Sequence, residues 1–162
     1  MRKPLFLFSL LLAFHALLYA QSDVRIVGVQ FHIQEEIYES PESFTIALEK
    51  EIRRVVLSGE ERPDLLVFPE YVSVFLALTP YVQQIQTSTS IDEALAKIRR
   101  KTSVRSIRQL FLNTAGRLEG EMDRIWGGLA RKYHVALIAG TYFAEREGDL
   151  YNLCVIYDEE GE

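Results

Sequence analysis

One carboxylate stands where an α/β protein would place a catalytic group. Glu70 follows the apolar run at residues 65–68 and Pro69, in the segment DLLVFPE. Ligands of α/β proteins gather outside the carboxyl ends of parallel strands, and a proline has no backbone donor with which to continue a strand ladder. A carboxylate held there and partly withdrawn from water can take a proton near neutral pH. The segment makes Glu70 a candidate general base, and a solvent-exposed loop glutamate is the alternative that it leaves open.

Few other residues have types and spacings that suggest chemistry. Cys154 is the single cysteine, so no internal disulfide can form, and its place in an apolar strand predicts a small buried side chain. His32 and His134 have no second histidine or carboxylate at ligand spacing. Gly127 and Gly128 lie inside a predicted helix and do not form a phosphate-binding loop. The sequence therefore predicts no metal site and no cofactor.

The elements before Glu70 are predicted to form a βαβ unit. Residues 24–31 are mostly β-branched or apolar, which predicts a strand buried on both faces. Residues 42–57 carry apolar side chains at helical spacing, with Ser40 as a predicted N-cap. Residues 65–68 are a second apolar strand. A strand, a helix and a strand over this length are typical of two parallel strands.

The rest of the chain predicts further helices and a hairpin. Helices are expected at residues 91–100, 103–112 and 119–133. Residues 135–143 and 150–157 read as two strands joined by a short polar turn, which indicates an antiparallel pair. Parallel and antiparallel strands together predict an α/β fold with a mixed sheet covered by helices.

The first residues are typical of a secretory signal peptide. Arg2 and Lys3 precede an uncharged, largely apolar run that ends at Ala20. We therefore expect a signal peptide at residues 1–20, a secreted or periplasmic protein, and no stable membrane association after cleavage. An uncleaved membrane anchor is the alternative, although the run is shorter than the roughly 20 residues of a spanning helix.

The charge balance argues against nucleic-acid binding. The chain has 18 basic and 23 acidic residues, and loss of residues 1–20 would remove two basic residues and leave a net charge of −7. Nucleic-acid partners require basic surfaces. The basic cluster at residues 97–101 is interpreted as a solvated helix face.

Four segments, in order, resemble the nitrilase family of carbon–nitrogen hydrolases. These segments are VRIVGVQF, DLLVFPEY, LARKYHVALIAGTYF and LYNLCVIYDEEGE. The resemblance covers most of residues 24–70 and 119–162, whereas residues 72–118 do not match closely. It implies that residues 23–162 are the N-terminal portion of a carbon–nitrogen hydrolase domain, an incomplete part of an α-β-β-α sandwich. It also implies a homo-oligomer for the full-length protein.

The resemblance implies a mechanism with a glutamate, a lysine and a cysteine. The glutamate activates the thiol, the thiolate attacks an amide or nitrile carbon, and the lysine stabilises the charged intermediate. Glu70 matches the catalytic glutamate. The family's lysine and cysteine follow the turn that here is at residues 158–162, so neither Lys132 nor Cys154 matches them. The piece alone is expected to be inactive and poorly stable.

Two other functions remain open. The first is a metal-dependent phosphoesterase of the endonuclease–exonuclease–phosphatase type, which also has a sandwich fold and a strand that ends in a glutamate. Pro69 before Glu70 and Gln30 near the end of the first strand favour the hydrolase. The second is a non-enzymatic nitrilase-like scaffold.

Overall fold

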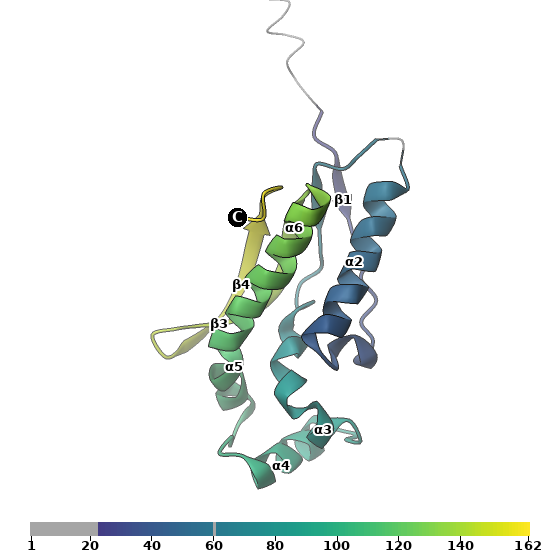
Figure 1. Cartoon of the computed structure of the whole chain (residues 1–162). Coiled ribbons are helices and arrows are strands. Elements are labelled where there is room, and N and C mark those ends of the chain that lie inside the picture. The colour runs from purple at the N-terminus through teal and green to yellow at the C-terminus, as the bar shows by residue number, and fades with distance from the viewer. Residues whose placement is uncertain (1–22, 60) are drawn as a thin grey trace, which may run out of the picture.

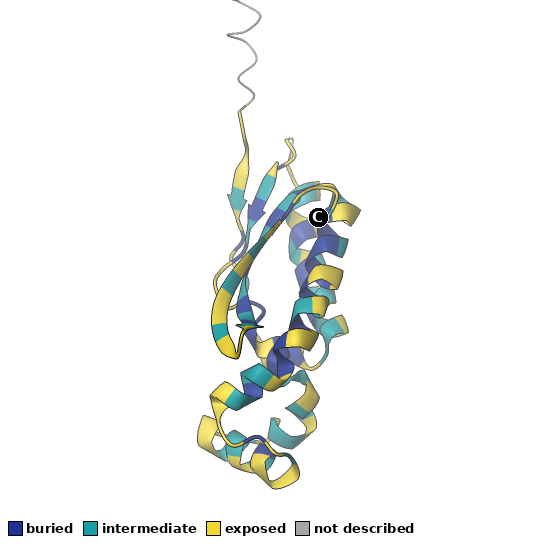
Figure 2. Cartoon of the chain, turned by 90° about the vertical axis from the view of Figure 1, so that its left-hand side faces the viewer, coloured by how far each residue is buried: buried dark blue, intermediate teal, exposed yellow. Residues whose placement is uncertain are grey.

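A four-stranded sheet forms the centre of the protein; the helices at residues 41–57 and 107–133 lie along one face, and those at residues 82–101 lie beyond one end of the sheet (Figures 1 and 2). The computed structural model describes residues 23–59 and 61–162. The strands follow one another across the sheet in chain order, with β1, β2 and β3 parallel and β4 antiparallel to β3. Their bounds are β1 Ile26–Gly28, β2 Leu65–Val67, β3 Ala136–Arg146 and β4 Asp149–Tyr157. The expected mixed sheet covered by helices is confirmed. The signal peptide predicted at residues 1–20 lies outside the described residues.

The predicted βαβ unit is present as β1, α2 and β2. Helix α2 spans Pro41–Leu57, and the Ser40 side chain accepts a hydrogen bond from the Ser43 backbone N–H at 3.0 Å. That cap satisfies one of the free donors of the first turn. The prediction that the first strand is buried on both faces is wrong. Ile26 is 60% exposed because no helix covers that face, whereas Val29 just beyond β1 is buried under the helices.

The segment after Glu70 is helical and irregular. It begins with the 3₁₀ helix η2, Val74–Tyr81, which the short α-helix α3, Val82–Ile85, follows directly. Helix α4, Ile91–Lys101, confirms the helix expected at residues 91–100. Another 3₁₀ helix, η1 Glu35–Tyr38, precedes α2 and lies near η2.

One continuous helical segment replaces two of the predicted helices. Helix α5 spans Ile107–Met122, the π-helical turn η3 spans Asp123–Gly127, and α6 spans Gly128–Tyr133. The separate helices predicted at residues 103–112 and 119–133 are therefore wrong in their boundaries. An unbroken buried stripe explains the continuity, and it consists of Leu110, Thr114, Ala115, Leu118 and Met122.

The glycine at the end of the π-helical turn permits a close contact. A Cβ atom on Gly127 would lie 2.7 Å from the carbonyl oxygen of Gly161, which itself has a φ of +80°. The Arg131 guanidinium donates to the Glu160 carbonyl at 2.8 Å beside it. The turn after β4 is thus packed directly against the helix, which a larger residue at position 127 would prevent.

The predicted hairpin is confirmed, and it contains a bulge. Strands β3 and β4 pair from Leu137–Tyr157 to Arg146–Asp149, with a register shift between Ile138 and Thr141. Glu147 and Gly148 make the connecting turn with positive φ angles of 55° and 87°, the backbone that tight hairpin turns require.

The core lies between the sheet and the helices, and the opposite sheet face is open (Figure 2). Trp126 is fully buried in this core, and its indole N–H donates to the buried Ser73 hydroxyl at 3.1 Å. On the open face, Ile26 and Ile156 are 60% and 64% exposed. Residues 23–59 and 61–162 thus form one sheet and one helical layer. No helix in this part of the chain is long and apolar enough to cross a membrane.

Candidate active site

Glu70 lies just beyond the carboxyl end of β2, one of the two inner strands of the sheet. The Phe68 backbone N–H still donates to the Ile138 carbonyl at 2.9 Å, so the ladder between β2 and β3 extends one residue past β2. Pro69 then ends it, because it has no N–H to donate. The sequence prediction that an apolar strand and a proline deliver Glu70 to this edge is confirmed.

The backbone around Glu70 is held by the bulge in β3. Gly140 has a φ of +67°, and a Cβ atom there would lie 2.2 Å from the Pro69 carbonyl oxygen. The next residue, Thr141, accepts a hydrogen bond at its Oγ1 from the Tyr71 N–H at 2.8 Å. Tyr71 has a φ of 62°, which turns the chain sharply after Glu70. The bulge therefore supports both sides of the glutamate.

Asn152 contacts the carboxylate directly. Its side-chain Nδ2 donates to Glu70 Oε1 at 2.8 Å. Asn152 lies on β4 opposite Phe143 of β3, and side chains alternate along a strand, so its amide points to the open face of the sheet. The Asn152 side chain thus reaches from β4 across β3 to the end of β2.

The contact between Asn152 and Glu70 is a feature of this site that the sequence did not predict. Asn152 stands in the segment LYNLCVIYDEEGE, which carries part of the resemblance, and nothing in that segment by itself indicates a contact with Glu70. The hairpin register could have indicated it, since Asn152 shares its face with Cys154 and Ile156. The bulge between Ile138 and Thr141 shifts the pairing of β3 with β4, and the sequence pattern does not predict it.

Tyr71 gives the carboxylate a second polar neighbour. The pKa of the Tyr71 phenol is raised, first by its hydrogen bond to the Glu70 carboxylate and then by the negative charge of Glu70. The Tyr71 ring lies 6.3 Å from the Phe143 ring, which packs edge-on against Phe111 at 4.6 Å. An aromatic wall therefore borders one side of Glu70.

The carboxylate itself is accessible to solvent. Glu70 is exposed in the structure of residues 23–59 and 61–162. The expectation that its carboxylate is partly withdrawn from water is therefore wrong for this part of the protein. The reason is the uncovered sheet face next to it. Its Oε1 is occupied by Asn152. A carboxylate accepts several hydrogen bonds, so the exposed Glu70 can accept more than the one from Asn152.

Cys154 lies on the open face rather than in the core. It pairs with Thr141, two residues along β4 from Asn152, and its side chain is exposed. The predicted burial of Cys154 is therefore wrong, because the face of β4 to which it belongs has no cover. Desolvation by neighbouring atoms nevertheless raises the pKa of its thiol, which disfavours the thiolate that a nucleophile needs.

Lys132 and Lys97, the first residue of the basic cluster, form ion pairs with glutamates other than Glu70. Lys132 Nζ contacts Glu49 Oε1 at 2.6 Å, between α6 and α2. Lys97 pairs with Glu93 at 2.8 Å within α4. Trp126 belongs to the core.

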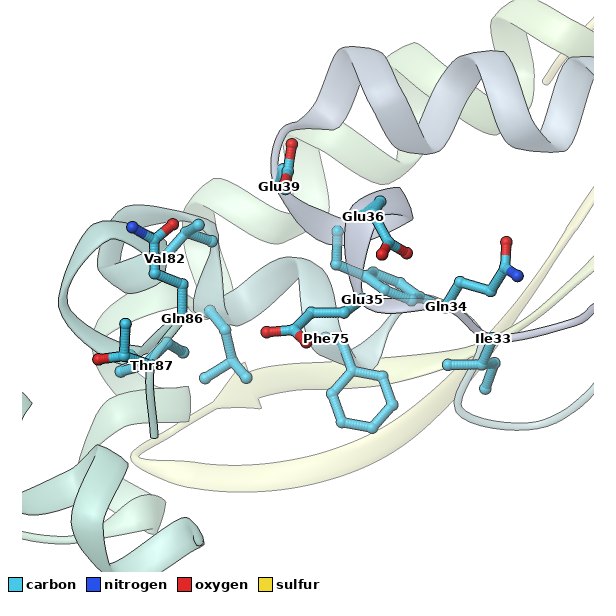
Figure 3. Close-up of a pocket in the computed structure, with 12 residues that line it drawn as sticks. Ile33, Gln34, Glu35, Glu36, Glu39, Phe75, Val82, Gln86 and Thr87 are labelled. Carbon is cyan, nitrogen blue, oxygen red and sulfur yellow. The ribbon is translucent and has the colours of Figure 1, made fainter. Parts of the chain in front are cut away.

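No metal-binding cluster involves these residues. In the two described ranges, no group of three or more His, Cys, Asp or Glu side chains could hold a metal ion. A pocket of about 650 Å³ lies between η1 and α3, and Glu70 does not line it (Figure 3). The candidate active site is at Glu70 rather than at this pocket, because Glu70 lies at the carboxyl end of an inner parallel strand.

Comparisons with known proteins found a solved structure that is similar to part of the chain. No protein-family model matches the chain. No curated protein matches it. The crystal structure of a carbon–nitrogen hydrolase from Helicobacter pylori G27 is similar with a TM-score of 0.47 and 19% sequence identity, over 86% of this chain and 37% of that chain. The chain therefore spans little more than a third of the solved chain that it matches.

Proposed function

We propose that residues 23–162 are the N-terminal portion of a hydrolase that acts on carbon–nitrogen bonds, with Glu70 as its general base. The observation that carries the proposal is the position of Glu70 at the end of an inner parallel strand, held by Asn152 from β4. The resemblance in the sequence motifs supports the choice of reaction.

The geometry suits a proton acceptor. A general base must be held within hydrogen-bond reach of its partner and must keep one oxygen available. The contact with Asn152 orients Glu70 at Oε1, and the exposed carboxylate is open to groups that approach over the uncovered sheet face. A nucleophile and a lysine that approached from that side would meet a carboxylate already fixed in place. In this proposal they come from the part of the domain that follows Glu162.

The proposal includes a substrate class and a setting. The substrate is a small amide or nitrile, the full-length protein is a homo-oligomer, and the predicted signal peptide directs it to the periplasm or outside the cell. Attack on the amide carbon would form an acyl-enzyme and release an amine or ammonia, and water would then release the acid.

The test uses the native coding sequence past Glu162 and the whole protein that it encodes. Release of ammonia from short amides and nitriles is measured for the natural protein, for Glu70→Gln and for the control Glu159→Gln, which changes an exposed turn glutamate. We expect Glu70→Gln to lose activity by roughly 10²- to 10⁴-fold and the control to keep it.

Three results would overturn the proposal. The first is full activity of Glu70→Gln. The second is magnesium-dependent phosphoester hydrolysis, which would favour the phosphoesterase. The third is a native reading frame without a lysine and a cysteine after Glu162, which would favour the scaffold.

A further inference from the structure

A second concave site lies apart from Glu70, at the end of the molecule where η1 faces η2 and α3 (Figure 3). Its volume is about 650 Å³, within the range of sites that hold small organic ligands. Its apolar lining comes from these three elements and from the segment that leads into η1, and it consists of Ile33, Tyr38, Phe75, Leu78, Val82 and Ile85.

Three carboxylates border this apolar surface. Glu35, Glu36 and Glu39 line the pocket together with the neutral side chains Gln34 and Gln86, and no lysine, arginine or histidine lines it. None of the ion pairs in residues 23–59 and 61–162 involves these three glutamates. In Figure 3 the Glu35 side chain extends from η1 toward Gln86 and Thr87, above the ring of Phe75. The pocket therefore combines an apolar wall with an uncompensated negative potential.

An aromatic pair forms part of the wall. The rings of Tyr38 and Phe75 meet edge to face, with centroids 5.4 Å apart. The Tyr38 hydroxyl donates to the Val72 carbonyl at 2.8 Å, which fixes the buried ring of the pair. Phe75 is 41% exposed, an unusual degree for a large apolar ring in an otherwise packed segment. A cation beside such a ring is attracted by the π electrons.

The carboxylates do not converge as metal ligands do. Within the described ranges no three acidic side chains could hold a single metal ion, so Glu35, Glu36 and Glu39 are spread around the pocket. Carboxylates spread around an apolar wall suit an organic cation better than a metal ion, because an organic cation has an apolar part that can contact the wall. Charge complementarity and shape therefore favour the same kind of occupant.

We propose that this pocket binds a small organic cation, namely an amine or quaternary ammonium group on an apolar ring or chain. The apolar part lies against Phe75, Leu78 and Ile85. The ammonium group lies toward Glu35 and Glu36. The site is independent of the proposed hydrolase chemistry, since Glu70 does not line it.

Binding to the whole protein tests the proposal, with three probes of nearly equal size. These are 2-phenylethylamine, which is a cation at neutral pH, the neutral 2-phenylethanol and the anion 3-phenylpropionate. Calorimetric titration gives the affinities, and amide chemical shifts locate the site. We expect the amine to bind about three- to tenfold more tightly than the alcohol, the anion to bind weakest, and the preference for the amine to shrink at high salt.

Variants separate the charge from the apolar wall. The double variant Glu35→Gln/Glu36→Gln should reduce the affinity for the amine to that for the alcohol and leave alcohol binding unchanged. Both positions are exposed, so the fold should persist. The control Glu159→Gln should change neither affinity. Equal affinity for the three probes, shifts confined to residues outside the pocket, or no saturable binding in the millimolar range would overturn the proposal.

Discussion

Asn152 and Glu70 are 82 residues apart in the chain, yet the Asn152 amide donates to the Glu70 carboxylate at 2.8 Å. The contact spans from the edge strand β4 to the end of β2, past β3. A neutral donor at this point orients the carboxylate without adding charge. We therefore regard Asn152 as a positioning residue for the proposed base.

The first prediction concerns this positioning. In the whole protein, and on the basis of the proposed hydrolase, Asn152→Ala should lower kcat roughly three- to tenfold with little change in KM, because one charge-assisted hydrogen bond is lost. Asn152→Asp should lower kcat further, since it places two carboxylates together. Steady-state kinetics measures both. Asn113→Ala, on the exposed side of α5, is the control, and equal kinetics for all variants would contradict the positioning role.

The second prediction concerns the bulge that supports Glu70. Gly140→Ala introduces a Cβ atom 2.2 Å from the Pro69 carbonyl oxygen at a φ of +67°. We expect the free energy of unfolding to fall by at least about 2 kcal/mol. Urea denaturation measures it.

Gly116→Ala provides the matched control for Gly140→Ala. Gly116 lies in α5 with nothing within 4 Å of an added Cβ atom, so alanine should raise stability by about 0.5–1 kcal/mol. Equal effects of the two substitutions would contradict the role given to the bulge.

The third prediction concerns the buried polar contact of the core. Ser73→Ala removes the acceptor of the Trp126 indole N–H, and both residues are fully buried. A buried donor without a partner costs about 1–3 kcal/mol of stability. Ser103→Ala, at an exposed position, should stay within about 0.5 kcal/mol. Denaturant unfolding compares the two, and equal stabilities would show that the contact contributes nothing.

The fourth prediction concerns alkaline pH. Burial raises the pKa of Tyr38 from 10.0 to about 12. Because the folded pKa is above the unfolded value, the neutral phenol stabilises the fold fully below pH 10.0, and that contribution is lost as the pH rises toward about 12.

Tyr38→Phe isolates this contribution. At neutral pH it should cost about 1 kcal/mol through loss of the hydrogen bond to the Val72 carbonyl. The stability difference from the natural protein should shrink above pH 10.0. Urea unfolding across this pH range measures it, with Tyr151→Phe at a 54% exposed position as control. A difference that is constant with pH would rule out the titration of Tyr38.

The fifth prediction concerns the open sheet face. Residues 23–162 on their own should self-associate, because Ile26 and Ile156 expose apolar surface on an uncovered sheet. Ile26→Lys/Ile156→Lys should reduce that association, as light scattering would show. The same double variant should impair folding of the whole protein, where we expect a second layer to cover this face. Ile46→Lys, at a 69% exposed position on α2, is the control and should do neither.

The sequence by itself determined the local elements and the position of Glu70. The period of apolar residues predicted α2, and Ser40 and Pro41 marked its start. The polar turn between two apolar runs predicted the β3–β4 hairpin. An apolar strand that ends at a proline predicted where Glu70 would lie. Each of these features depends on residues that are close together in the chain, and local sequence patterns can therefore predict it.

The tertiary structure alone decided the features that depend on distant partners. It showed that Asn152 reaches Glu70, that the bulge at Gly140 supports Pro69, and that Gly127 lies against Gly161. It also corrected the burial of the first strand and of Cys154, because an apolar strand has the same sequence whether one face or both are covered. Cover and cross-strand register depend on residues far apart in the chain, and no local pattern encodes them.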